Sequence, residues 1–334
     1  MKKNMLITTA LTTLVATSAF AETKVTGNLE QVIRLNSQEG GAASEQGIGS
    51  EYNIGLASSK DLDNGLSAKY GFVLEDGGMD THYLTVGAGS VSLTIGADTG
   101  NNLSSSAIPH IGDQAGTLVA DLGGTYNNQG IASGAAGTIT DAHEDDHVSI
   151  DIKGLGGTFT ARYSPDSNGG GNKDSGIGTN SGSGSEILYS GSLGVDGLKV
   201  IVGSASQDAN DSTKEDGKYK KGGISYNFGQ FAVGVERQEA EGITAAATQV
   251  ETESDKASVT FAANDNLSVG LMYIETEKKV GGAKEANDEE IIVASVGYNL
   301  GGLGIELNYS EVENTGNAAN NDDEAFQIRT IQKF

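Results

Sequence analysis

The sequence has no cysteine and no tryptophan, and only two of its 334 residues are proline. Without cysteine the chain has neither disulfide bonds nor a thiolate nucleophile. Basic residues are also scarce, because 21 lysines and arginines stand against 45 aspartates and glutamates, which gives a formal net charge of −24. A chain with this balance cannot neutralise a run of phosphates, so the sequence excludes a nucleic-acid partner.

Apolar residues make up only 37% of the sequence, whereas 49 residues are glycine. That apolar share is too small for the core of a large soluble domain. Collagen is excluded because it needs glycine at every third position together with abundant proline. No apolar run beyond the N-terminus reaches the length of a membrane-spanning helix, so a helical membrane protein is excluded as well.

Residues 1–21 have the features of a secretory signal peptide. Lys2 and Lys3 precede an apolar stretch from about Met5 to Ala16, and Ala19-Phe20-Ala21 forms a small-x-small cleavage site. We therefore expect an exported protein whose mature domain covers residues 22–334.

The mature sequence consists of short segments in which every second residue is apolar, joined by turn signals. Residues 66–74 show this period clearly, and residues 52–56 show it just before them. Between these two segments, Asn64-Gly65 supplies the positive φ of a tight hairpin turn. Counting from an opening strand at 23–36 to a closing strand at 324–334, the pattern predicts about 16 strands of roughly 9 to 11 residues.

The connections between these segments alternate between short and long, and the long ones hold most of the polar residues. This asymmetry is typical of an up-and-down barrel that crosses an outer membrane. A β-sandwich would also alternate, with its apolar face buried and its polar face exposed, so periodicity alone does not separate the two folds. Strand number, strand length, loop asymmetry and export together favour an all-β fold, a transmembrane antiparallel up-and-down β-barrel.

Two hairpins and the C-terminus resemble the trimeric general porins of Gram-negative outer membranes. The phrase Asp61-Leu62-Asp63-Asn64-Gly65-Leu66-Ser67-Ala68 is similar to the family's first periplasmic turn. Residues 84–96 are similar to its second turn, and the chain ends on Phe334, as porins do. The resemblance implies a non-enzymatic, water-filled channel in the outer membrane of a Gram-negative bacterium, for passive diffusion of small hydrophilic solutes and ions.

The resemblance also implies where the pore is narrowest. In porins the third external loop folds into the lumen, and the longest stretch without clear strands, residues 99–145, occupies that place in strand order. Its carboxylates Asp113 and Asp121 are therefore the expected acidic residues of the constriction.

Basic residues are expected on the wall opposite this loop, because strand alternation places six of them on the lumen face. They are Arg34, Lys69, Arg162, Lys199, Lys256 and Arg329. An acidic loop facing basic wall residues would set up a transverse field, as in the family's constrictions. The alternative is that these charges are solvated separately at different heights, since alternation fixes a residue's face but not its depth.

The resemblance implies three kinds of partner: a homotrimer, the lipid and lipopolysaccharide of the outer membrane, and the barrel-assembly machinery, for which Phe334 is the expected signal. One departure concerns the trimer. The loop at about Asp76 to Asp80 is very short, whereas in the family this loop latches onto a neighbouring subunit.

Further acidic residues lie at or near the predicted long loops, in residues 275–277, 285–290 and 322–324. They make the pore mouth electronegative, which predicts a modest preference for cations. We expect no resident cofactor and assign no metal-site residues, although such carboxylates could hold calcium or magnesium ions that bridge to lipopolysaccharide phosphates. The simpler interpretation is a solvated acidic surface.

Two other functions remain open at this stage. An outer-membrane barrel enzyme would need His143 and His147, which flank three acidic residues and form the one metal-like cluster in the sequence. A secreted β-rich adhesin or surface-layer protein would instead be soluble without detergent.

Overall fold

The computed structural model describes residues 22–38, 46–62, 65–76, 78–97, 102–103, 105–111, 146–165, 183–209, 213–242, 249–319 and 321–334. The predicted signal peptide lies outside these ranges. Within them, no helix is long and apolar enough to span a bilayer.

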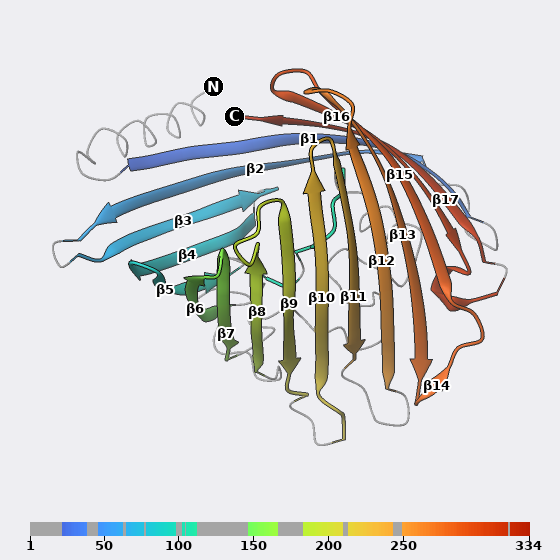
Figure 1. The fold of residues 1–334 in the computed structure, drawn as a ribbon, viewed down its shortest axis with the longest axis horizontal. Helices are drawn as coiled ribbons and strands as arrows, with labels where there is room; N and C mark the ends of the chain where they lie inside the picture. Colours follow the sequence, from blue (N-terminus) through green and yellow to red (C-terminus); the bar gives the residue numbers. More distant parts are fainter. Residues whose placement is uncertain are drawn as a thin grey trace.

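The described residues form a single sheet with almost no helix (Figure 1). Its strands are β1 (Glu22–Gln38), β2 (Gln46–Asp61), β3 (Ser67–Glu75), β4 (Gly78–Ala88), β5 (Val91–Ala97), β6 (His147–Gly154), β7 (Gly157–Ser164), β8 (Gly184–Gly191), β9 (Leu198–Gln207), β10 (Gly217–Phe228), β11 (Phe231–Glu241), β12 (Val250–Ala262), β13 (Leu267–Val280), β14 (Ala283–Lys284), β15 (Glu289–Asn299), β16 (Leu303–Glu313) and β17 (Asp323–Lys333). The two-residue strand β14 only folds back onto the end of β13, so the other 16 strands form the wall.

Each strand pairs antiparallel with its neighbours in chain order, and Figure 1 shows this order as the colours run from blue to red. The last strand returns to the first, since β17 pairs with β1 from Asn28 opposite Lys333 to Gln38 opposite Asp323. The predicted all-β barrel of about 16 strands is therefore confirmed. Strand lengths vary more than predicted, from 7 residues in β5 to 17 in β1.

Alternation along each strand separates the two faces of the wall. In β12, Ser254, Lys256 and Ser258 are buried, whereas the alternate residues Asp255, Ala257 and Val259 are exposed. Large apolar side chains on the exposed face include Leu29, Ile54, Leu93, Ile150, Val202, Ile224, Leu271, Ile292 and Leu307. Since hydrocarbon accepts only this apolar set, the exposed face is the lipid face and the polar set faces the lumen.

The two ends of the barrel differ in their connections, as predicted. At one end the turns are short, for example Gly229-Gln230 between β10 and β11, where Gly229 takes a φ of +75° that suits glycine. Next to this turn the rings of Tyr226, Phe228 and Phe231 stack on the lipid face, with centroids 6.3 and 5.8 Å apart. Such aromatic residues mark the level of the membrane interface.

The other end carries the longer connections, with one exception. Only Asp76 and Gly77 lie between β3 and β4, so the second loop is as short as the sequence predicted. Asp76 accepts a hydrogen bond from the backbone N–H of Tyr52 at 3.2 Å, which ties this turn back to β2.

Candidate functional site

A segment that follows β5 lies against the inside of the barrel. We call its described residues, 102–103 and 105–111, the inner segment. Leu103, Ala107 and Ile108 are no more than 2% exposed, and their neighbours are lumen-facing side chains of the strands from β8 onward. A connection between strands that enters the barrel narrows its lumen, so the inner segment is the candidate pore constriction.

Two lysines of the wall hold carbonyl groups of the inner segment. Lys221 Nζ of β10 donates to Leu103 O at 2.9 Å. Lys199 Nζ of β9 donates to Ser106 O at 2.6 Å. An ammonium group can donate up to three hydrogen bonds, so each lysine satisfies a carbonyl that has no strand partner.

A buried carboxylate holds the next residue of the inner segment. The N–H of Ala107 donates to Glu236 Oε2 at 2.7 Å. The other oxygen of Glu236 lies 2.8 Å from Lys256 Nζ and 3.3 Å from Lys221 Nζ. The three side chains are at most 1% exposed, so this charged cluster lies between the strands and the inner segment, away from water.

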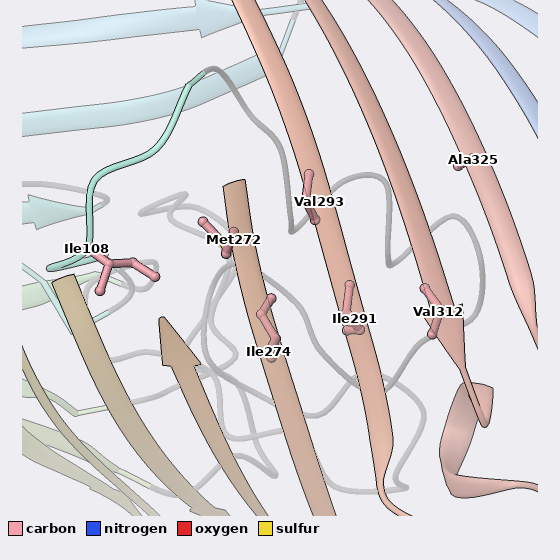
Figure 2. Close-up of a cluster of buried hydrophobic side chains, with 7 residues drawn as sticks. All are labelled: Ile108, Met272, Ile274, Ile291, Val293, Val312 and Ala325. Carbon is pink, nitrogen blue, oxygen red and sulfur yellow. The ribbon is translucent and has the colours of Figure 1, made fainter. Parts of the chain in front are cut away.

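Apolar packing secures both ends of the inner segment. Leu103 is buried in a cluster with Leu188, Ala205, Tyr219 and Ala240. Figure 2 shows the second cluster, in which Ile108 points toward the strand that carries Met272 and Ile274, with Ile291 and Val293 of β15, Val312 and Ala325 beyond. Burying one such leucine or isoleucine stabilises the packing by roughly 1.5–3 kcal/mol.

Three of the six predicted basic residues lie at or beneath the inner segment. Lys256 is paired with Glu236, and Lys199 holds the Ser106 carbonyl. Arg162 is fully buried against Glu186, with Arg162 Nη1 2.5 Å from Glu186 Oε1. These cations are on the lumen face, but their charges are bound to the wall or to the inner segment.

The other three basic residues lie on β1, β3 and β17, which are on the opposite side of the barrel from β10. Arg329 lies between two carboxylates, 2.6 Å from Glu30 Oε2 and 3.5 Å from Glu306 Oε2. Lys69 Nζ lies 5.3 Å from the ring centre of Tyr83, a cation–π contact.

Arg34 completes this set as a half-buried side chain on the lumen face of β1. Both predicted constriction acids, Asp113 and Asp121, fall outside the described residues. The transverse field between them and the basic wall therefore stays a prediction.

The histidine cluster is described only in part, since His143 falls outside the described residues. His147 is a buried residue of β6, and the neighbouring Asp146 binds His82, with His82 Nε2 2.9 Å from Asp146 Oδ1. In the described ranges, no three His, Cys, Asp or Glu side chains are grouped so that they could hold a metal ion.

Phe334 lies at the short-turn end and continues the closing pair of strands. Its backbone N–H donates to Gly27 O at 3.0 Å and its carbonyl accepts from Gly27 N at 3.1 Å. The ring is 71% exposed, so the packing of the chain itself leaves it available to another molecule.

The central residues of this site, Lys221 and Glu236, were not among the residues predicted from the sequence. The sequence did contain a pattern that points to them, because alternation places both residues on the lumen face. Glu236 also stands directly opposite Lys256 in the strand register. What alternation could not show is that the inner segment lies over them.

Comparison with known proteins identifies the same architecture. A family model described as Gram-negative porin matches residues 8–317. Among solved structures, in-vitro folded OmpT, an outer membrane protein of Vibrio cholerae, is 13% identical with a TM-score of 0.67, covering 94% of this chain and 98% of that chain. The trimer form of that protein is 14% identical with a TM-score of 0.63, covering 94% and 100%.

A mutant of the Rh. blastica porin is also similar, at 12% identity and a TM-score of 0.58, covering 94% of this chain and 100% of that chain. At these identities the structural likeness shows the fold alone. No curated protein matches the sequence.

Proposed function

Because the chain belongs to the Gram-negative porin family, we propose that it forms a water-filled outer-membrane channel through which small hydrophilic solutes and ions diffuse passively. The observation that carries this proposal is the inner segment held inside a closed barrel. A sheet whose lumen face is polar and whose outer face is apolar suits water inside and lipid outside. A segment fixed within the lumen restricts the path without any chemical step.

A channel accounts for the charges better than an enzyme does. Glu236 and Glu186, the buried acids of the site, are bound to lysine, arginine and backbone groups of the constriction. Such pairing stabilises the position of a segment, whereas a general acid or base must be able to exchange a proton with substrate.

Planar-bilayer recording of the detergent-purified protein tests this function. We expect discrete conductance steps in potassium chloride, and uptake of sugars into proteoliposomes that falls with sugar size. A correctly folded, heat-modifiable barrel that shows neither steps nor uptake would overturn the proposal. A protein that stays monodisperse in buffer without detergent would instead support the adhesin or surface-layer alternative.

Cation preference is the finer part of the proposal. Across the barrel from the charged cluster, the single guanidinium of Arg329 is bound to two carboxylates, Glu30 and Glu306. With a formal charge of −24 on the whole chain, this supports a path in which negative charge predominates.

We further propose that three copies associate through the lipid face of β1–β5. The outward positions of β1 from Thr23 to Leu35, of β3 from Ala68 to Leu74 and of β5 from Val91 to Ala97 are all uncharged. The outward rows of these three strands are uncharged and mostly apolar, which suits them to burial against a second copy. The two-residue turn after β3 provides no latch, so this contact would depend on the barrel walls alone.

Divalent cations and lipopolysaccharide are the proposed partners of the opposite lipid face. Asp255, Glu275, Glu290 and Glu313 stand directly opposite one another on the neighbouring strands β12, β13, β15 and β16. We call these four residues the acidic row. Arg237 is paired with Asp255 at 2.9 Å, so the repulsion falls mainly on the three glutamates. Like charges in this arrangement destabilise a sheet, and calcium or magnesium ions shared with lipid phosphates would relieve the repulsion.

The acidic row lies toward the long-loop end of the barrel, which is the outer end in this topology. At the other end, Phe334 is the proposed signal for the barrel-assembly machinery, since its ring is exposed and its backbone is fixed to Gly27.

A further inference from the structure

The wall beneath the inner segment carries glycine on five strands. They are Gly203 of β9, Gly223 of β10, Gly234 of β11, Gly270 of β13 and Gly297 of β15. None of the five has the positive φ that favours glycine. Glycine weakens the interior of a strand, so its recurrence here calls for a reason other than backbone conformation.

Contacts with the first half of the inner segment explain two of these glycines. A Cβ atom added at Gly223 would lie only 2.5 Å from the Cβ of Ala107. One added at Gly203 would lie 2.7 Å from Leu103 Cδ2. Both separations are below 3.0 Å, which real Cβ atoms essentially never show. At Gly223 the inner segment occupies the space of the missing side chain, and at Gly203 it shares that space with Ile187 O of the neighbouring strand, which would lie 2.4 Å from the added Cβ.

The second half of the inner segment repeats the arrangement. A Cβ at Gly234 would lie 2.8 Å from Pro109 Cδ, and a Cβ at Gly297 would lie 2.9 Å from Ile111 Cγ2. At Gly270 the corresponding distance to Ile111 Cδ1 is 3.2 Å.

The order of these contacts follows the order of the strands. Leu103, Ala107, Pro109 and Ile111 lie in turn over β9, β10, β11 and the pair β13 and β15. The intervening strand β12 offers Ser258, a small residue whose hydroxyl donates to Pro109 O at 2.7 Å. The glycines therefore form one continuous track across the inner wall.

We propose that this glycine track sets the size limit of the pore. Without side chains at these positions, the inner segment lies directly on the strand backbones, and the rest of the lumen stays open to solutes. A methyl group at Gly223 would push Ala107 from 2.5 Å to the ordinary contact range of 3.4–4 Å, toward the pore axis. The proposal rests on the channel function proposed above and names positions that determine its width.

The test compares neighbouring glycines that face opposite sides of β10. Gly223→Ala adds a methyl group beneath Ala107, whereas Gly222→Ala adds one on the lipid face, where nothing lies within 4 Å. We expect Gly223→Ala to lose single-channel conductance and to exclude the larger sugars that the parent admits, while Gly222→Ala matches the parent.

A compensating pair sharpens the test, because Ala107→Gly removes the atom that the new methyl group would meet most closely and leaves only the Glu236 side chain, at 3.1 Å, beside it. The double variant Ala107→Gly with Gly223→Ala should recover the conductance and the sugar cut-off of the parent. The proposal would be overturned if Gly223→Ala kept the conductance and sugar cut-off of the parent, or if the double variant showed the same reduced values as Gly223→Ala alone. Should Gly223→Ala fail to fold, Gly297→Ala alone and combined with Ile111→Ala provides the same comparison.

A disulfide separates this proposal from the channel function itself. The chain has no cysteine of its own, so Ala107→Cys with Gly223→Cys creates one possible bridge. Disulfides need Cβ atoms about 3.5–4.5 Å apart, so a small shift of Ala107 toward the pore axis would suffice. If the two thiols stay free under oxidation, Ala107 does not lie on Gly223, and the glycine track does not carry the inner segment. If the disulfide forms but neither the bridged variant nor the parent conducts ions, the proposed channel function is wrong. The contact between the inner segment and the glycine track would still stand.

Discussion

Glu236 of β11 and Lys256 of β12 face each other on adjacent strands, with 2.8 Å between Glu236 Oε1 and Lys256 Nζ and almost no exposure of either side chain. The same carboxylate accepts the N–H of Ala107, so one residue joins two strands and the inner segment. Glu236 therefore contributes both to the stability of the wall and to the position of the constriction.

Replacing Glu236 should lower the stability of the protein. Glu236→Gln leaves Lys221 and Lys256 buried without their carboxylate, and breaking a buried ion pair from one side costs about 3–5 kcal/mol. We expect a matching loss in the free energy of unfolding, measured by urea titration in detergent micelles.

The control is Glu239→Gln on the same strand, which removes the exposed partner of Lys220 at 3.5 Å. Exposed pairs contribute about 0–1 kcal/mol, so this variant should be close to the parent. Equal stability of the two variants would show that the buried cluster does not hold the wall.

Ion selectivity is the second prediction. We expect the parent channel to prefer potassium over chloride, more strongly in dilute salt, because screening acts over about 8 Å at physiological ionic strength. Reversal potentials under a potassium chloride gradient should shift toward zero for the double variant Asp113→Asn with Asp121→Asn. Chloride preference in the parent, or an unchanged double variant, would mean that Arg34, Lys69 and Arg329 govern the path.

The C-terminal residue gives a prediction about assembly. Deleting Phe334 removes the exposed ring and two backbone hydrogen bonds to Gly27. We expect less barrel in the outer membrane and more unfolded chain in the periplasm, measured by fractionation and heat-modifiable migration. Phe334→Tyr keeps the backbone contacts and an aromatic ring, so it should assemble as the parent does; a deletion that assembles equally well argues against the signal.

The acidic row predicts a dependence on divalent cations. Adding magnesium to the protein in lipopolysaccharide-containing liposomes should raise its melting temperature, and a chelator should reverse the change. Glu290→Gln removes a carboxylate that faces Glu275 on one side and Glu313 on the other, so it should weaken the magnesium response. Asp265→Asn, an exposed carboxylate in the short turn between β12 and β13 at the other end of the barrel, serves as the control. An equal response in both variants would contradict the bridging role.

Much of the wall could be predicted from the sequence, because the face of a strand residue depends only on its neighbours in the chain. Arg34, Lys199 and Lys256 lie on the lumen face as alternation indicates. Alternation carries no information about what lies over that face. Lys256 is buried under residues that precede it by about 150 positions, a tertiary contact that no local pattern encodes.

The same limit applies to the glycine track. Each glycine reads locally as a weak point in a strand, and only the path of the inner segment explains why the five belong together. In contrast, the hairpin between β2 and β3 was predictable, since its turn chemistry and both strands lie within one short stretch.

Closure of the barrel has a consequence for the timing of biosynthesis. The ion pair between Arg329 and Glu30 joins residues 299 positions apart, and the strands that carry them are the last and the first to be synthesised. Each sheet edge stays open until the ribosome has released the whole chain, and open edges pair readily with other chains. The barrel can therefore close only after its final strand has been synthesised, so no wall without an open edge exists at any earlier stage of synthesis.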